Sequence, residues 1–458
     1  MSARTAAAGP AVDPIPILRD LIRFRSVNPP GDERRCAEYI AELLADAGIE
    51  SLMLGPDPER PNLVARIPGR GEAPPLLLHG HSDVVPTDGQ EWTHPPFDAL
   101  LIDGEVWGRG AIDMKGGLAM MLSALLTLHA RGEAPAGDVL LAVVSDEENG
   151  SRVGAGWLAT HHPELFEGIP YCIGEDGGAV LTVDPARRFH PVGVAEKRAC
   201  WLRLTLRGRG GHASRQGWPN LAVHQLTDVL TALRDGRLPV HITPALDRML
   251  QELGTAVGSE LAAEMVALRK GERTTVPYEL MDTADAVYLD STIRHTVNAT
   301  IIRTPEKINM IPAEITVDLD GRILPGDFTV EDYIAELRAL VNAYSASGTL
   351  GDELEIELLL EGSRNPKNEP ELGAFYERLT DILRAADPEG LPIPMITPAS
   401  TDARLFANLG MDCYGWLPML LPAGSRYQEN MHDADERVPA DAVRFGADCL
   451  YELLLDHP

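Results

Sequence analysis

The chain has 458 residues, and its 69 acidic and 40 basic residues give a formal charge of −29. The length predicts more than one domain, each with its own core, and the acidic balance excludes nucleic acid as a partner because no basic footprint for a phosphate backbone is present. Five cysteines without a C-x-x-C pair indicate neither disulfides nor a zinc knuckle, and no apolar run reaches the roughly 20 residues of a membrane span. We therefore expect a cytoplasmic protein without membrane contact.

The first half of the chain alternates helical and strand patterns. Helices are predicted over 15–24, 34–48 and 116–132, and strands within 62–69, 76–86, 139–150 and 171–178. This alternation predicts an α/β fold with a mostly parallel sheet flanked by helices. In such sheets, reactive groups collect at the carboxyl ends of the strands.

From about residue 194 the order of elements changes. Strand 198–208, helix 219–234, strands 298–305 and 314–325, helix 329–344 and strand 353–362 give the order βαββαβ of a compact α+β domain. The predicted division is a first domain at 1–193, a second domain at 194–361 and the rest of the first domain at 362–458. Residues 236–296 form a helical and loop insertion whose role the pattern does not indicate.

Ionisable residues cluster where apolar runs end or where glycine-rich turns follow. The clusters are HGHSDVVP (79–86), GRGAIDMKGG (108–117), SDEENG (145–150), IGEDGG (173–178) and, much later, MHDADERV (431–438). An unpaired charge at the end of a buried strand is costly, and metal coordination would neutralise these groups together. Imidazole and carboxylate ligands without cysteine favour zinc, with cobalt or manganese as alternatives.

Single clusters also have structural interpretations. His79 is expected to be a hydrogen-bonded core residue, the pair Glu147 and Glu148 alone would suit a solvated turn, and Asp113 could cap the following helix. The chain has no G-x-S-x-G elbow, no H-E-x-x-H helix and no Walker A loop. These absences argue against a serine hydrolase or a nucleotide-dependent enzyme.

Taken together, the motifs resemble the M20 metallopeptidase and aminoacylase family, which includes carboxypeptidase S, aminoacylase-1, carnosinases and succinyl-diaminopimelate desuccinylase. The resemblance continues through RGGHAS (209–214), KINMIPAE (307–314) and DGRILPG (320–326). It implies a catalytic α/β domain with an inserted βαββαβ lid that also forms a homodimer, and two divalent metal ions per chain.

The resemblance assigns the metal ligands by position: His81 for one ion, Asp113 bridging both, Glu148 and His432 for the other, and an acidic residue of IGEDGG. Both Glu175 and Asp176 are available there. We favour Glu175 because its place just before the glycines resembles the family's acidic position. Two cations bring four positive charges, and three carboxylates plus a bridging hydroxide would balance them.

The resemblance also assigns the groups around the metals. Glu147 would be the general base for the attacking water, and Asp83 would accept the second ring N–H of His81. His212 would stabilise the oxyanion in the active site of the partner subunit.

The expected reaction is hydrolysis of an amide bond, by metal-bound hydroxide, in a dipeptide or an N-acyl-amino acid with a free carboxylate. Arg322 would bind that carboxylate with its guanidinium fork, and Asn309 would lie on the substrate side. Peptidase and amidase activities share this apparatus within the family. The alternatives are deacylation of N-succinyl or N-acetyl diamino acids and a non-catalytic, metal-stabilised binding protein.

Overall fold

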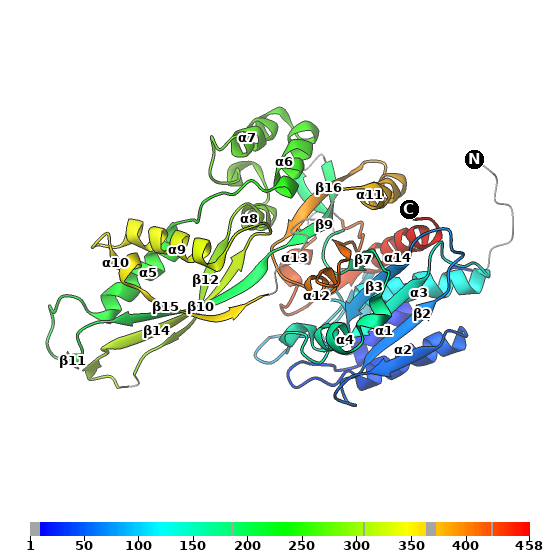
Figure 1. Ribbon diagram of the computed structural model, residues 1–458, viewed down its shortest axis with the longest axis horizontal. Helices are drawn as coiled ribbons and strands as arrows, with labels where there is room; N and C mark the ends of the chain where they lie inside the picture. The colour runs from blue at the N-terminus through cyan, green and yellow to red at the C-terminus, as the bar shows by residue number, and fades with distance from the viewer. Residues whose placement is uncertain (1–9, 179, 185–186, 306, 363–371, 423–424) are drawn as a thin grey trace.

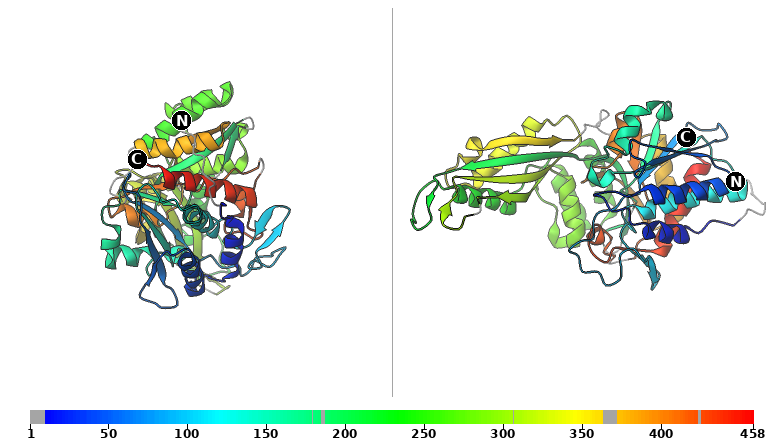
Figure 2. Two further views of the ribbon diagram at one scale, coloured as in Figure 1. Left: turned by 90° about the vertical axis from the view of Figure 1, so that its right-hand side faces the viewer. Right: turned by 90° about the horizontal axis from the view of Figure 1, so that it is seen from below.

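A computed structural model describes residues 10–178, 180–184, 187–305, 307–362, 372–422 and 425–458 (Figure 1). The chain forms an α/β body and an elongated second unit, called the lid below, that projects from one side of it, as Figure 1 and the right-hand view of Figure 2 show. Among the described residues, no helix combines the length and the apolar character needed to cross a bilayer.

The body is built on a nine-stranded sheet. Its strands are, in spatial order, β1 (Ser51–Leu54), β2 (Asn62–Ile67), β6 (Val139–Val144), β3 (Leu76–His81), β7 (Tyr171–Gly174), β17 (Asp412–Gly415), β9 (Arg187–Glu196) and β16 (Gly390–Thr397), with β8 (Leu181–Asp184) paired to β9. The four neighbours β6, β3, β7 and β17 are parallel to one another. The predicted α/β class with helices around a largely parallel sheet is confirmed.

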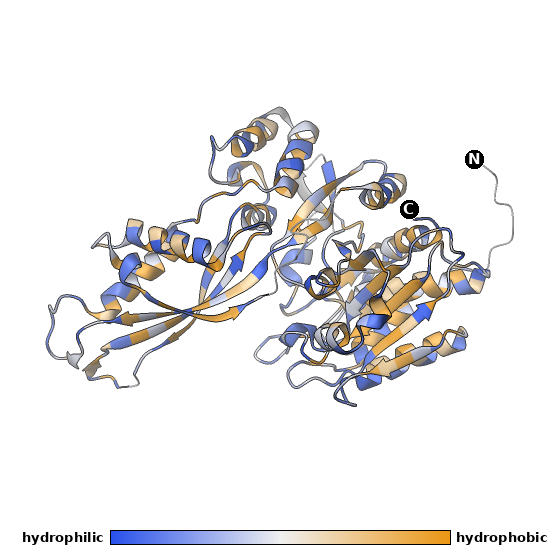
Figure 3. Ribbon diagram, in the orientation of Figure 1, coloured by the Kyte–Doolittle hydropathy of each residue, from blue (hydrophilic) through white to orange (hydrophobic). Residues whose placement is uncertain are grey.

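Helices cover both faces of this sheet because its strands are apolar on both sides. The body helices are α1 (Pro14–Arg23), α2 (Arg34–Asp46), α3 (Lys115–Arg131), α4 (Ala155–His161), α11 (Ala374–Ala386), α12 (Ala403–Ala407), α13 (Tyr427–Asn430) and α14 (Ala440–Leu455). Within β3, Leu76 and Leu78 belong to the larger core, whereas Leu77 belongs to the smaller core that Leu158 of α4 and Phe406 of α12 complete. Figure 3 shows the hydrophobic colour concentrated on these central strands.

A small antiparallel ladder joins distant parts of the body. It contains β4 (Leu100–Ile102), β5 (Glu105–Trp107) and β18 (Arg437–Pro439), in the order β18-β5-β4. Trp107 pairs with Arg437. The segment that leaves β5 and the segment that enters β18 therefore lie side by side at this end of the ladder.

The lid is a four-stranded antiparallel sheet with helices. It contains β10 (Arg198–Arg207), α5 (Ala222–Asp235), β12 (Thr296–Arg303), β14 (Glu314–Ile323), α9 (Val330–Tyr344), α10 (Leu350–Glu353) and β15 (Glu355–Glu361), with the sheet order β12-β14-β10-β15. Helix α9 begins with a capping box between Thr329 and Asp332. A separate core holds the lid together, formed by residues such as Leu204, Val317 and Leu337. The tip of the lid carries the short pair β11 (Gly211–His212) and β13 (Met310–Ile311).

The insertion leaves and re-enters the lid but packs on the body. It contains α6 (Pro244–Ala256), α7 (Ser259–Arg269), the 3-10 turn η3 (Tyr278–Leu280) and α8 (Thr283–Thr292). Helix α6 lies against β16 and β9, and α8 lies against β8 and β16. The predicted return of the chain to the catalytic domain near residue 362 borders residues 363–371, which lie outside the described part.

Candidate metal centre

The carboxyl ends of three neighbouring parallel strands carry the imidazole and carboxylate groups. Strand β3 ends at His81, β6 is followed by the 3-10 turn η1 (Glu147–Asn149), and β7 is followed directly by Glu175. Because β6, β3 and β7 are adjacent and parallel, their carboxyl ends meet at one edge of the sheet. The sheet topology therefore gathers His81, Glu148 and Glu175.

The small ladder brings Asp113 and His432 to the same edge. The pairing of Trp107 with Arg437 aligns the two segments that carry them. As a result, the Nε2 atom of His432 lies 2.9 Å from Oδ2 of Asp113, although 319 positions separate them in the sequence.

Glu436 fixes the backbone of Asp113, a role that the sequence reasoning missed. Its buried carboxylate accepts hydrogen bonds from the N–H groups of Ile112 (2.7 Å) and Asp113 (3.2 Å) and from the guanidinium of Arg109 (2.6 Å). Arg109 also donates to the carbonyl of His432 at 3.2 Å. The only sequence signal for Glu436 is its place within the MHDADERV cluster.

Five of the predicted ligands form two groups of three that share Asp113. His81 Nε2 lies 3.0 Å from Asp113 Oδ1 and 3.2 Å from Glu175 Oε2. On the other side, His432 Nε2 lies 2.9 Å from Asp113 Oδ2 and 3.6 Å from Glu148 Oε1. Within each group the potential ligand atoms all lie within 4.8 Å of one another. Asp113 thus offers one carboxylate oxygen to each group.

Asp176 belongs to neither group. Its carboxylate accepts a hydrogen bond from the N–H of Gly177 at 2.8 Å and also interacts with Thr397. Between Glu175 and Asp176, the geometry brings Glu175 into the ligand set.

The charges of the two groups fit divalent cations. Burial raises the pKa of Glu175 to about 7, and burial together with Asp113 raises the pKa of Glu148. The hydrogen bond to Asp113 and the Glu148 carboxylate 3.6 Å away raise the pKa of His432 to about 10. Burial lowers the pKa of His81, but Glu175 and Asp113 raise it well above its usual value. These shifts show that the buried carboxylates need positive charge beside them, which divalent cations would supply.

The donor set also fits such ions. Glu148 Oε1 is buried and meets no hydrogen-bond partner among the described residues, so it remains available as a ligand. Two imidazoles, three carboxylates and no thiolate suit zinc, cobalt or manganese rather than a soft ion.

Asp83 lies behind His81 and contacts several groups of the candidate centre. The Nδ1 atom of His81 lies 3.0 Å from the backbone carbonyl of Asp83 and 3.5 Å from its carboxylate. That carboxylate accepts hydrogen bonds from the N–H groups of Glu147 (3.3 Å) and Glu148 (3.2 Å) and from the side chain of Asn28 (2.8 Å). Asp83 therefore holds the η1 turn as well as the histidine, and Asn28 is a second supporting residue that no sequence pattern indicated.

The three predicted substrate-side residues lie at opposite ends of the lid. His212 is exposed on β11 at the tip, and Asn309 is beside it, since its carbonyl accepts from the N–H of Ala213. Figure 1 shows β11 at the end of the lid farthest from the body. Arg322 lies near the root of the lid, where two of its nitrogens bind the Asp320 carboxylate at 2.7 and 3.0 Å.

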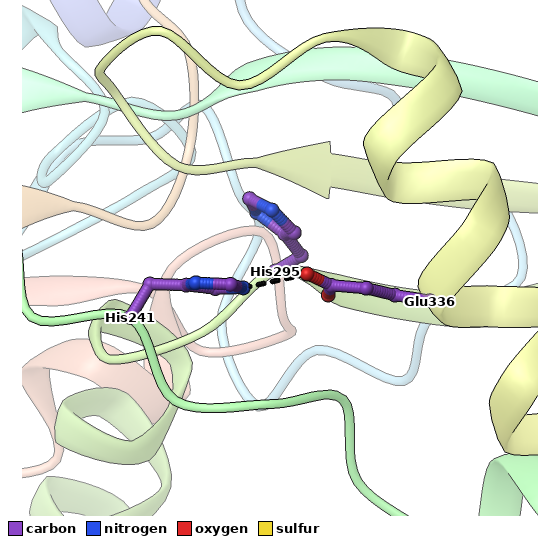
Figure 4. A group of neighbouring side chains, drawn as sticks. All are labelled: His241, His295 and Glu336. Carbon is purple, nitrogen blue, oxygen red and sulfur yellow. Dashed lines mark hydrogen bonds and ion pairs between the residues drawn. The ribbon is translucent and has the colours of Figure 1, made fainter.

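A third group of potential ligands, His241, His295 and Glu336, lies at the root of the lid (Figure 4). Burial lowers the pKa of His295 to about 3, so the ring is neutral, and its Nδ1 accepts a hydrogen bond from the N–H of Leu324 at 3.0 Å. The ring proton is consequently on Nε2, which cannot bind a metal in this tautomer. We interpret the group as a clamp in which His241 Nε2 and Glu336 Oε1 pair at 2.7 Å.

Comparisons with known proteins identify the family of the chain. Residues 77–456 match the family model described as Peptidase family M20/M25/M40. A succinyl-diaminopimelate desuccinylase of Paracoccus denitrificans is 30% identical over 75% of this chain and 87% of its own length, and a probable carboxypeptidase S-like protein 2 of Dictyostelium discoideum is 27% identical over 83% and 71%.

Among solved structures, the M20 family metallo-carboxypeptidase Sso-CP2 from Sulfolobus solfataricus has the same fold. It superposes with a TM-score of 0.68 at 19% identity and covers 96% of this chain and 98% of its own. The family match spans every residue of the two ligand groups. The chain belongs to the M20/M25/M40 peptidase family and is a metallohydrolase of the M20 type.

Proposed function

We propose that the protein is a dinuclear metal-dependent hydrolase that cleaves the amide bond of a dipeptide or of an N-acyl-amino acid with a free carboxylate. The observation that carries the proposal is the pair of three-residue ligand groups joined by Asp113. His81 and Glu175 would hold one ion, and Glu148 and His432 the other, with zinc as the favoured metal. When bound, two such ions polarise a scissile carbonyl and increase the acidity of water between them.

Glu147 is suited to move the proton. Burial and the neighbouring Glu175 raise its pKa well above the usual value for a glutamate. A carboxylate with a raised pKa accepts a proton from water more readily and can then deliver it to the leaving amine. The hydrogen bond from its N–H to Asp83 keeps Glu147 in the η1 turn beside the ligand Glu148.

Replacing Glu147 tests the mechanism. Glu147→Gln keeps the shape of the side chain but removes the base, so we expect kcat to fall by about 10²- to 10⁴-fold while metal analysis still finds two ions per chain. Glu167→Gln, at an exposed glutamate outside the centre, is the matched control and should keep full activity. Unchanged turnover in Glu147→Gln would refute Glu147 as the base.

The substrate carboxylate is assigned to Arg322. Its fork is held in a planar, bidentate pair with Asp320, which orients the guanidinium at the root of the lid near the body. A carboxylate of the substrate would share this group with Asp320.

Deacylation of an N-succinyl diamino acid is the second candidate, because one of the most similar relatives is named succinyl-diaminopimelate desuccinylase. A panel of dipeptides, N-acetyl-amino acids and N-succinyl diamino acids, assayed with zinc, cobalt and manganese, separates the two. Preference for the succinylated substrates by kcat/KM would select the second candidate.

We further propose a homodimer formed through the lid, in which His212 completes the site of the partner. The distance of β11 from the body in Figure 1 supports donation to another subunit. The edge strand β12 exposes Ile301 and Ile302, which are 46% and 45% accessible, and so offers an apolar surface for pairing.

Mixing inactive variants tests this arrangement. His212→Ala and Glu147→Gln each lack one group, but a mixed dimer restores one complete site if His212 acts across the interface. Random re-pairing of equal amounts would recover about a quarter of the wild-type activity. If His212 served its own chain, no mixture would recover activity.

A further inference from the structure

The insertion between α5 and β12 is structurally part of the body. Buried side chains of α6 and α8, such as Leu246, Leu250 and Leu289, belong to the same hydrophobic core as the central sheet. The core of the lid contains none of these side chains among the described residues. Figure 1 shows α6 and α8 beside β16 and β9, although the chain enters and leaves this region through the lid.

A narrow neck holds the insertion in place. Val240 and Arg294 form an antiparallel bridge, and the N–H of His241 donates to the carbonyl of Ile293 at 2.9 Å. The clamp between His241 and Glu336 of α9 fastens this neck to the lid (Figure 4). The insertion therefore contacts both the lid and the central sheet.

From this position, α8 brings Tyr288 to the loop that carries Glu175. The Tyr288 hydroxyl is buried and faces the carboxylate of Asp176. In the described part of the chain this hydroxyl has no hydrogen-bond partner at standard distance and angle, Asp176 included. A buried hydroxyl without a partner is costly, and the Asp176 carboxylate is the acceptor that faces it.

This loop has an unusual backbone that needs support. Asp176, Gly177 and Gly178 have φ angles of 64°, 74° and 83°, three successive residues in the left-handed region. A Cβ atom at Gly177 would lie 2.2 Å from the carbonyl oxygen of Gly415, so the loop also packs tightly against β17. The orientation of Glu175 at the start of this loop depends on how firmly the following residue is held.

We propose that Tyr288 is a positioning residue for the metal centre: its hydroxyl holds the Asp176 carboxylate and thereby orients Glu175 toward His81. The inference rests on the proposed role of Glu175 as a ligand. It gives the insertion a function, because the insertion supplies a support for the metal loop from outside the central sheet. Groups that orient a ligand from behind typically change metal affinity by about 10- to 100-fold when removed.

The experiment measures zinc affinity rather than turnover. The purified metal-free protein is titrated with zinc in competition with a chromophoric chelator, for wild type, Tyr288→Phe, Asp176→Asn and the double variant. We expect Tyr288→Phe to weaken the binding of one of the two zinc ions by about tenfold and to leave the affinity for the other unchanged. Tyr278→Phe is the matched control, since the hydroxyl of Tyr278 in the same insertion faces Asp290 instead.

The double variant distinguishes positioning from a general loss of structure. If Tyr288 acts through Asp176, the double variant binds zinc no more weakly than Asp176→Asn alone. The inference would be overturned if the losses of zinc affinity in the two single variants multiplied in the double variant. It would also be overturned if Tyr288→Phe bound zinc as tightly as wild type. A thermal transition of metal-free Tyr288→Phe that drops while zinc affinity stays constant would show a purely structural role and overturn it as well.

One further variant separates this inference from the proposed function. Glu175→Gln should lose one of the two zinc ions. If it keeps both, the assignment of Glu175 as a ligand is wrong. If it loses one while Tyr288→Phe binds like wild type, the ligand set stands and only the role of Tyr288 is rejected.

Discussion

Glu436→Gln gives a direct test of how the small ladder supports the centre. In the native protein the buried carboxylate accepts hydrogen bonds from Arg109, Ile112 N–H and Asp113 N–H. A glutamine has one oxygen and one NH₂ group, so either Arg109 or the two backbone N–H groups lose their acceptor. Breaking a buried ion pair by removing one partner costs about 3–5 kcal/mol.

Other contacts of Arg109 place the expected loss at the lower end of this range. Arg109 keeps hydrogen bonds to Gln90 (2.8 Å) and to the carbonyl of His432 (3.2 Å). We therefore expect the free energy of unfolding to fall by about 3 kcal/mol. For a chain of 458 residues, the unfolding entropy is roughly 1 kcal/mol per degree, so Tm would fall by about 3 °C.

The assay is urea unfolding of the metal-free protein, which separates folding from metal binding, followed by metal analysis. Glu105→Gln in the same ladder is the control, because Glu105 pairs with Arg437 at 3.1 Å where both side chains are partly exposed, and such pairs contribute about 0–1 kcal/mol. If Glu436→Gln were no less stable than Glu105→Gln, the assigned support of Asp113 would be refuted.

Three other predictions follow from the charges. Hydrogen bonds from Arg188 lower the pKa of Asp387 to about 2, below its value in the unfolded chain. Asp387→Asn should therefore reduce the free energy of unfolding by about 2 kcal/mol at pH 7. Urea unfolding should show this difference between variant and wild type shrinking as the pH falls from about 4 toward 2. His432 has a pKa of about 10 and Glu175 of about 7 in the metal-free protein, so zinc binding should release protons and should become tighter as the pH rises. Calorimetry in buffers of different ionisation enthalpy measures the proton release. A binding enthalpy that does not depend on the buffer would contradict the prediction. Arg322→Ala should raise KM by about tenfold or more for substrates with a free carboxylate but leave KM unchanged for the corresponding methyl esters, and equal effects on both would exclude the assigned contact.

The sequence predicted the strands that carry the centre but not the far edge of the sheet. Strand β3 is predicted because Leu76, Leu77 and Leu78 form an apolar run before a polar turn. The family motifs mark the ends of β6 and β7. Strands β9 and β16 contain Pro191, Pro392 and Pro394, residues that suppress a strand prediction. Strand β16 tolerates its prolines because it is the last strand of the sheet order.

The packing of the insertion and the supporting residues of the site were not predictable from local patterns. The apolar faces of α6 and α8 fit either the core of the lid or that of the body, and only the folded chain selects the body. The residues proposed as ligands were assigned from the family resemblance, and four of them, His81, Asp113, Glu148 and Glu175, also end an apolar run or lie in a glycine-rich turn, whereas His432 does neither. Asn28 and Glu436 support them across 55 and 324 positions of sequence, and a single sequence contains no signal for such a pairing.

The pairing of β5 with β18 also has a consequence for biosynthesis. During translation, His81, Asp113 and Glu175 leave the ribosome early, whereas His432 follows only after the whole lid has been made. If the two ligand groups bind cations as proposed, the first group is therefore synthesised long before the second is complete. The second group is complete only when the segment before β18 pairs with the chain after β5 and brings His432 beside Asp113.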